Sequence, residues 1–175
     1  NLPMMLEALK PFVADYQLII AGAPGMDASY YAKYIGDDVP VKILFGQTYR
    51  LLQQAKAALV TSGTATLETA LFKTPQVVCY YTPIGKIIAF LRKKILKVKF
   101  ISLVNLVADK EVVRELVADT MTVDNIRREL SLIIKEASAG RVQMLQEYDR
   151  MLQILGPAGA SCQAASKMVE LLKNR

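Results

Sequence analysis

The sequence predicts an α/β protein with a Rossmann-like parallel sheet, helices on both of its faces, and an all-helical C-terminal stretch. Over residues 1–110, short and nearly continuous apolar runs alternate with segments of helical periodicity. This alternation is typical of buried parallel strands joined by crossover helices. From residue 111 onward, apolar residues recur only at helical spacing. We therefore expect an α/β core over residues 1–110 and a helical region over residues 111–175.

The first half of the chain supplies most of the predicted sheet. A helix is expected over residues 2–12, because Pro3 falls in its first turn and Asn1 precedes it as a candidate cap. The predicted strands are residues 16–22, 39–45, 57–61 and 76–80. The helices between and after them are predicted at residues 27–35, 48–55, 64–72 and 84–96.

The second half is predicted to be helical after one short strand near residues 100–103. Its helices are expected at residues 111–116, 123–136, 140–154 and 158–173. Gly156 and Pro157 separate the last two. No repeat or flexible linker interrupts the chain, so we predict a single domain over residues 1–175.

The composition excludes several classes of function. At 175 residues and 53% hydrophobic content, the chain is too apolar for disorder. Histidine is absent, which removes the commonest general base, the usual zinc ligand and the base of a serine or cysteine triad. Cys79 and Cys162 have neither metal-ligand spacing nor a disulfide framework. A reducing compartment and no metal are expected.

The net charge of +6 is concentrated in one segment. No acidic residue occurs between Thr82 and Ile101, and the cations there equal the whole excess: Lys86, Arg92, Lys93, Lys94, Lys97 and Lys99. Large apolar residues are interleaved with them, a pattern that suits contact with an anionic bilayer. The alternative is a helix that packs on the core with a solvated outer face. One basic segment on an otherwise neutral protein does not favour nucleic acid.

The loop after the strand at residues 57–60 has the chemistry to bind a phosphate. Gly63 allows a phosphate to approach the backbone, and hydroxyls from Ser62, Thr64 and Thr66 lie at the start of the following helix. Glu68 comes one turn later and can accept hydrogen bonds from a ribose diol. The alternative is an ordinary N-cap at Ser62 or Thr64. The dinucleotide glycine fingerprint and the P-loop lysine pattern are missing, which argues against a nicotinamide enzyme or an ATPase.

Two ordered blocks resemble the lipid-A-disaccharide synthase family of GT-B glycosyltransferases. The first is Leu-Val-Thr-Ser-Gly-Thr-Ala-Thr-Leu-Glu-Thr-Ala-Leu at residues 59–71, followed by Thr-Pro-Gln-Val-Val-Cys-Tyr at residues 74–80. The second is residues 101–116, similar to that family's Ser-Leu-Pro-Asn-Leu and Glu-Val-Val-Pro-Glu-Leu stretch. Val104 and Arg114 stand where the family has prolines. The resemblance covers nearly the whole chain and implies the C-terminal half of a GT-B enzyme.

The resemblance also implies roles for individual residues. Ser62, Gly63, Thr64 and Thr66 would hold the diphosphate of UDP, Glu68 would hold its ribose, and Asn105 and Glu111 would line the sugar or acceptor side. A contact with uracil is expected from the loop Gly46, Gln47 and Thr48. Each assignment has a simpler alternative: Asn105 satisfies its own turn, and Glu111 favours a helix N-terminus.

The reaction implied by the resemblance transfers 2,3-diacylglucosamine from UDP to 2,3-diacylglucosamine 1-phosphate, without metal or cofactor. The family's general base and much of its acceptor pocket are attributed to an N-terminal domain. That domain, and a strand with a Pro-Gly-Ser-Arg type loop expected before Asn1, are not in this chain. No catalytic residue is therefore assigned here, and the chain alone is expected to be inactive. A cytoplasmic location, peripheral at the inner membrane, is expected, with Lys86, Arg92, Lys93, Lys94 and Lys97 facing the lipid; homodimerisation stays open.

Two rival functions remain at this point. The first keeps the fold but changes the reaction to a UDP-GlcNAc epimerase or another GT-B transferase, against which the block at residues 105–116 argues. The second is a non-catalytic domain that uses the basic segment to dock on lipid or protein. Absence of UDP binding would favour this second rival.

Overall fold

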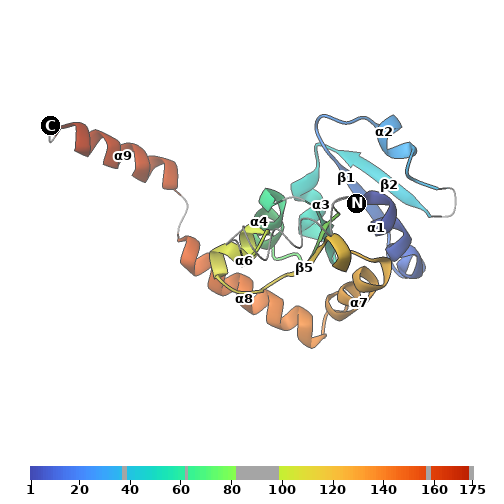
Figure 1. The fold of residues 1–175 in the computed structure, drawn as a ribbon. Helices are drawn as coiled ribbons and strands as arrows, with labels where there is room; N and C mark the ends of the chain where they lie inside the picture. The colour runs from blue at the N-terminus through green and yellow to red at the C-terminus, as the bar shows by residue number, and fades with distance from the viewer. Residues whose placement is uncertain (37–38, 62, 82–98, 157–158, 174–175) are drawn as a thin grey trace.

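The computed structural model describes residues 1–36, 39–61, 63–81, 99–156 and 159–173. Within them, two parallel sheets are flanked by helices (Figure 1). The first sheet pairs β1 (Leu18–Gly22) with β2 (Val41–Phe45), and the second has the order β3 (Ala58–Val60), β4 (Gln76–Tyr80), β5 (Arg114–Val117). All three strand pairs are parallel. The predicted α/β class with a parallel Rossmann-like arrangement is confirmed.

The N-terminal elements follow the sequence prediction closely. α1 (Leu2–Leu9) continues into the 3-10 turn η1 (Lys10–Phe12). α2 (Ala28–Ala32) is capped by Asp27, whose carboxylate accepts from the Tyr30 amide at 3.0 Å. Asn1 occupies the N-cap of α1 without a side-chain cap bond. Its Oδ1 instead accepts from the Tyr81 amide at 2.6 Å, which ties the start of α1 to the carboxyl end of β4.

The second sheet contains the core. Four of the five residues of β4 are buried, because it lies between β3 and β5. α3 (Thr48–Gln54) leads into β3, and α4 (Gly63–Leu71) follows β3 and packs on β3 and β4. α7 (Val123–Ile133) packs on β4 and β5. A buried cluster that includes Val77, Leu116, Ile126 and Tyr148 fills the space between these elements.

Two predicted elements are wrong. Residues 100–103 do not form a strand: Ser102 caps α6 (Leu103–Ala108) and accepts from the Asn105 amide at 3.2 Å. Residues 111–116 do not form a helix, because residues 114–117 pair with β4 as β5. The pairing buries Leu116 and Val117, a long-range gain that overrides the local helix preference. The α/β core therefore extends beyond residue 110, into the stretch that was predicted to be entirely helical.

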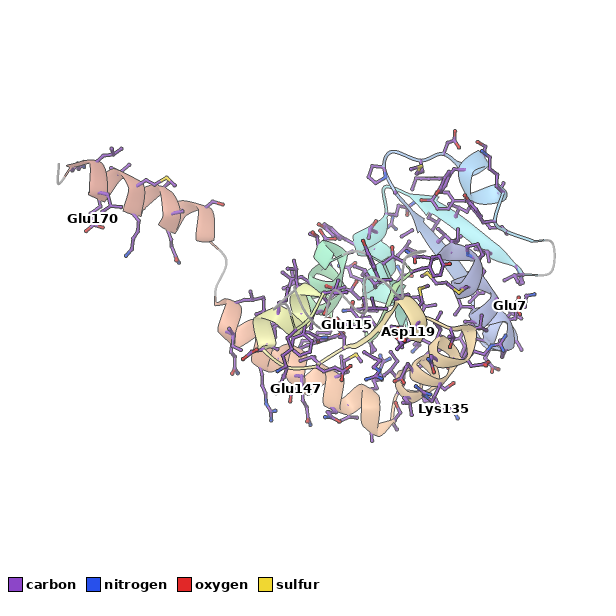
Figure 2. All side chains as sticks on the ribbon, viewed as in Figure 1. Glu7, Glu115, Asp119, Lys135, Glu147 and Glu170 are labelled. Atoms are coloured by element: carbon purple, nitrogen blue, oxygen red, sulfur yellow. The ribbon has the colours of Figure 1, made fainter. Side chains whose placement is uncertain are left out.

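The remaining helices confirm the prediction for the C-terminal stretch. η2 (Ala118–Thr120) precedes α7, and α8 (Ala139–Leu155) contacts α4, α6 and α7. α9 (Ala160–Lys173) projects away from the rest of the molecule (Figure 1). Glu170 on α9 accordingly lies apart from Glu115 and Glu147 (Figure 2). The helix predicted at residues 84–96 lies outside the described residues. None of the helices in the described part of the chain combines the length and apolar character needed to cross a bilayer.

Candidate functional site

The N-terminus of α4 lies at the carboxyl end of β3, as the sequence predicts. β3 ends at Val60 and α4 begins at Gly63, with Thr64 exposed on its first turn. The first turn has no acidic side chain, so the positive end of the helix dipole is not neutralised locally. Ser62, the first of the predicted phosphate ligands, lies outside the described residues. This edge of a parallel sheet is where open α/β folds bind ligands.

The fold does not require a glycine at position 63. Its φ angle is outside the left-handed region that favours glycine, and a Cβ built on it would lie 3.7 Å from the Ile101 carbonyl oxygen, an ordinary contact. Gly140 differs, because its Cβ would lie only 2.8 Å from the Leu132 carbonyl oxygen. Among the described residues, a methyl group would therefore fit beside Gly63 without a clash.

Thr66 is buried and supports the start of α4 from inside. It is 0% exposed, and its hydroxyl donates to the Gly63 carbonyl at 2.5 Å. Its own carbonyl accepts from Gln76 Nε2 at 2.9 Å, and that nitrogen also donates to the Tyr148 hydroxyl at 3.1 Å. Tyr148 in turn donates to the Thr74 carbonyl at 3.3 Å. This network holds the α4 N-terminus against β4 and α8. Thr66 therefore supports the predicted site as part of this network, since its hydroxyl is bonded within the helix.

Glu68 and the predicted uracil-side loop are brought together by a residue that the sequence argument missed. The Tyr49 hydroxyl donates to Glu68 Oε1 at 3.3 Å, and the Tyr49 ring packs on Phe72 with centroids 5.2 Å apart. Tyr49 lies in the first turn of α3, directly after the loop formed by Gly46, Gln47 and Thr48. No local pattern identifies Tyr49, because its partner is 19 residues away.

The loop before α3 is open to solvent. Gly46 is exposed, with a φ of +68° that favours glycine. Gln47 is the N-cap of α3, but its side chain makes no cap hydrogen bond. Thr48 is exposed beside it. These three residues lie next to Tyr49, and through it next to Glu68.

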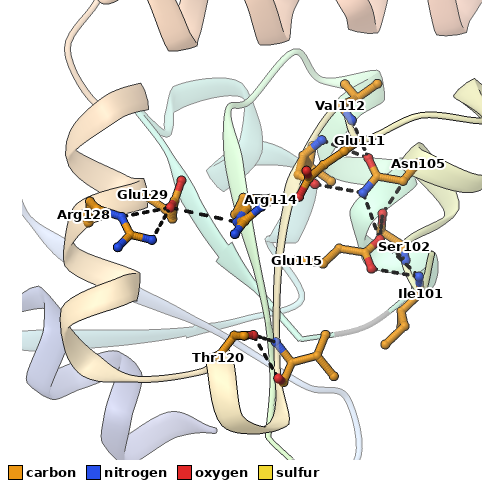
Figure 3. A network of polar contacts seen from close by, with 12 residues as sticks. Ile101, Ser102, Asn105, Glu111, Val112, Arg114, Glu115, Thr120, Arg128 and Glu129 are labelled. Atoms are coloured by element: carbon orange, nitrogen blue, oxygen red, sulfur yellow. Dashed lines mark hydrogen bonds and ion pairs between the residues drawn. The ribbon is translucent and has the colours of Figure 1, made fainter. Parts of the chain in front are cut away.

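Asn105 is fully buried, and both polar atoms of its side chain are occupied (Figure 3). Oδ1 accepts from the amides of Val112 and Val113 at 2.7 and 2.9 Å. Nδ2 donates to the Val113 carbonyl at 2.8 Å and to Glu115 Oε1 at 2.9 Å. Its geometry therefore favours the alternative that Asn105 fixes its own turn and the approach to β5.

Glu111 precedes β5 and so lies near the amino ends of the parallel strands, whereas α4 begins at the carboxyl end of β3. It is exposed and pairs with Arg114 at 3.0 Å, at the start of β5. It lines a cleft of about 220 Å³ together with Glu129 and Glu147. The Lys110 ammonium bonded to Glu147 at 2.5 Å lowers the pKa of that carboxyl. The structure does not bring Glu111 to the Gly63 loop.

The predicted lipid-facing cations lie outside the described residues: Lys86, Arg92, Lys93, Lys94 and Lys97. Both flanks of their segment are described. At the first, Tyr81 donates to Asn1. At the second, Lys99 lies 5.0 Å from the centroid of the Phe100 ring, and the Ile101 amide donates to Glu115.

The described residues contain no group of His, Cys, Asp or Glu arranged for a metal ion. Burial raises the pKa of the Cys79 thiol to about 12, so this buried cysteine is no nucleophile at neutral pH. The parallel sheets, with the α4 N-terminus at the carboxyl end of β3, place the chain among Rossmann-like α/β proteins.

Comparison with known proteins defines the family within this class. Residues 28–169 match the lipid-A-disaccharide synthetase family, and the chain belongs to it. The lipid-A-disaccharide synthase of Psychromonas ingrahamii is 35% identical over 164 residues, which are 92% of this chain and 42% of that protein. The synthase of Myxococcus xanthus is 35% identical over 175 residues, 98% of this chain and 45% of that protein. The resemblance of the two sequence blocks is confirmed, and the chain spans less than half the length of these relatives.

Proposed function

We propose that this chain is the UDP-sugar-binding part of a lipid-A-disaccharide synthase. The observation that carries the proposal is the α4 N-terminus: it follows β3 at the carboxyl edge of the sheet and presents Gly63, whose missing side chain the surrounding fold does not require. Backbone N–H groups at such a terminus bind phosphate. The diphosphate of UDP would lie against Gly63 and Thr64, with Ser62 assigned from the sequence alone.

The ribose is assigned to Glu68. Its carboxylate lies one turn beyond the phosphate-binding residues, and Tyr49 orients it at 3.3 Å. The uracil would then meet the loop Gly46, Gln47 and Thr48, which precedes Tyr49. Thr66 contributes by fixing the first turn of α4, since its hydroxyl is already used within the helix.

The reaction proposed for the whole enzyme is the transfer of 2,3-diacylglucosamine from UDP to 2,3-diacylglucosamine 1-phosphate. The bond from the anomeric carbon to the UDP oxygen breaks, and a glycosidic bond forms to an acceptor hydroxyl, whose proton passes to a base. Negative charge builds on the departing UDP, where the α4 N-terminus would stabilise it. We assign the base and much of the acceptor pocket to the part of the relatives' length that this chain does not span. Binding without turnover is expected of the chain alone.

Calorimetric titration with UDP and with pyrophosphate tests the proposal. The wild-type chain should bind UDP, and Glu68→Ala should weaken UDP more than pyrophosphate, because only UDP has a ribose. Glu170→Ala on α9 is the matched control, since it removes an exposed carboxylate far from the loop. No UDP binding by the wild type would contradict the function, and equal losses for both ligands would contradict the ribose assignment.

A second role, peripheral contact with the inner membrane, is supported by the charge distribution. The cations between Lys86 and Lys99 equal the whole net charge of +6. The substrates proposed here are acylated, so a cationic and apolar segment would suit their reception at the bilayer surface.

A further inference from the structure

The Glu115 carboxylate accepts several hydrogen bonds from one short turn (Figure 3). Its Oε1 accepts from the Ser102 amide at 2.9 Å, the Ser102 hydroxyl at 2.8 Å and Asn105 Nδ2 at 2.9 Å. Its Oε2 accepts from the Ile101 amide at 2.9 Å. One carboxylate on β5 therefore fixes the turn that starts α6. Hydrogen bonds to an ionised acceptor are roughly twice as strong as neutral ones.

This turn lies next to the start of α4. The carbonyl of Ile101 faces Gly63, at 3.7 Å from the position of a Cβ on that glycine. α6, which begins at the same turn, packs directly on α4. Glu115 accepts from the amides of Ile101 and Ser102, and the carbonyl between these two amides is the one that faces Gly63. A shift of the Glu115 carboxylate would therefore move the Ile101 carbonyl relative to Gly63.

We propose that Glu115 is a positioning residue for the nucleotide's diphosphate, acting through Ile101 on the Gly63 loop. This inference rests on the proposed function, since it names the residue that holds the phosphate side of that site. Glu115 does not touch the ligand. Glu115 accepts from the Ile101 amide, and the Ile101 carbonyl faces Gly63. Separately, Gln76 Nε2 donates to the Thr66 carbonyl and to the Tyr148 hydroxyl.

The test compares Glu115→Ala, which removes all these acceptors, with Glu115→Gln, which keeps one carbonyl oxygen for the turn. Glu129→Gln is the control: Glu129 is a largely buried carboxylate in the same region that contacts Arg114 and Arg128. Hydrogen exchange of the ligand-free chain is measured at the amides of residues 67–70, whose helical partners are the carbonyls of residues 63–66. Affinities for UDP and for uridine are measured by calorimetry.

We expect Glu115→Ala to speed exchange at residues 67–70 and to weaken UDP about tenfold, a loss of about 1.4 kcal/mol, while uridine changes less than about twofold. Glu115→Gln should restore part of both effects, and Glu129→Gln should cause neither. If Glu115→Ala fails to fold, Glu115→Gln decides by the same measurements.

Faster exchange confined to residues 99–105, or equal losses of UDP and uridine, would overturn the positioning role. If the wild-type chain binds no UDP, the proposed function fails by itself. The exchange measurement then still decides whether Glu115 holds the Gly63 loop.

Discussion

At the scale of single residues, substitution of Gly63 tests whether the glycine serves ligand binding, because the fold does not require a glycine there. Gly63→Ala should leave stability unchanged or raise it by about 0.5 kcal/mol, because alanine loses less backbone entropy on folding. The added methyl group would hinder close approach of the phosphate to the backbone N–H groups of this turn, so UDP affinity should fall about tenfold or more. Thermal unfolding and calorimetry measure the two effects.

Gly140→Ala provides the contrast for this substitution. Its Cβ would lie 2.8 Å from the Leu132 carbonyl oxygen, so the backbone must shift and stability should fall. UDP affinity of the folded fraction should be unchanged. Loss of stability without loss of affinity in Gly63→Ala would contradict the phosphate assignment.

The two cysteines should differ sharply in reactivity. Burial raises the pKa of Cys79 to about 12, so at pH 8 this thiol stays protonated and reacts slowly. Cys162 is exposed on α9. Alkylation of the native chain followed by mass spectrometry should modify Cys162 alone, with Cys79 reacting only after denaturation. Rapid modification of Cys79 in the native state would show that the region around β4 opens readily.

At the scale of elements, the buried network of Gln76, Thr66 and Tyr148 joins α4, β4 and α8. Tyr148→Phe keeps the ring but removes the hydroxyl that donates to Thr74 and accepts from Gln76. Leaving buried polar groups unpaired costs about 1–3 kcal/mol, so the free energy of unfolding should fall by that amount in urea titrations. Tyr49→Phe is the matched control, because Tyr49 is 55% exposed and its stability effect should be small.

The elements that the sequence predicts well are those whose cause is local. Residues 76–80 form β4 with the predicted bounds, because four consecutive apolar residues follow Gln76. β5 was predicted as a helix, since residues 114–117 carry Arg, Glu and Leu and only pairing with β4 makes them a strand. Gly63, Thr64 and Glu68 could be predicted as neighbours in the candidate site because they lie within six consecutive residues. The Tyr49–Glu68 contact and the Glu115 hydrogen bonds join residues that only the fold brings together.

At the scale of the whole molecule, the charge is divided unevenly. Many described cations outside the basic segment are paired with carboxylates, as in Lys73 with Asp149 at 2.7 Å and Arg127 with Glu7 at 3.5 Å. Such exposed pairs contribute little to stability, but they cancel charge locally. The net charge of +6 therefore belongs, in sum, to residues 82–101. An anionic surface should attract the molecule through that segment.

The last prediction follows from this division of charge. Cations beside an anionic bilayer contribute roughly 1 kcal/mol each, and the attraction is screened over about 10 Å at 0.1 M salt. Co-sedimentation of the chain with anionic vesicles should therefore occur at low salt and fall steeply as salt rises. Reversing the charges of Arg92, Lys93 and Lys94 should abolish it.

The control for this experiment reverses three exposed cations elsewhere: Lys33, Lys42 and Arg50. Both triple variants have the same net charge, so only a local effect of the basic segment separates them. Equal loss of vesicle binding in the two variants would show that net charge alone attracts the chain. If the wild type ignores anionic vesicles even at low salt, the segment does not dock on lipid in this chain, and its interleaved apolar side chains are better explained by packing within the protein.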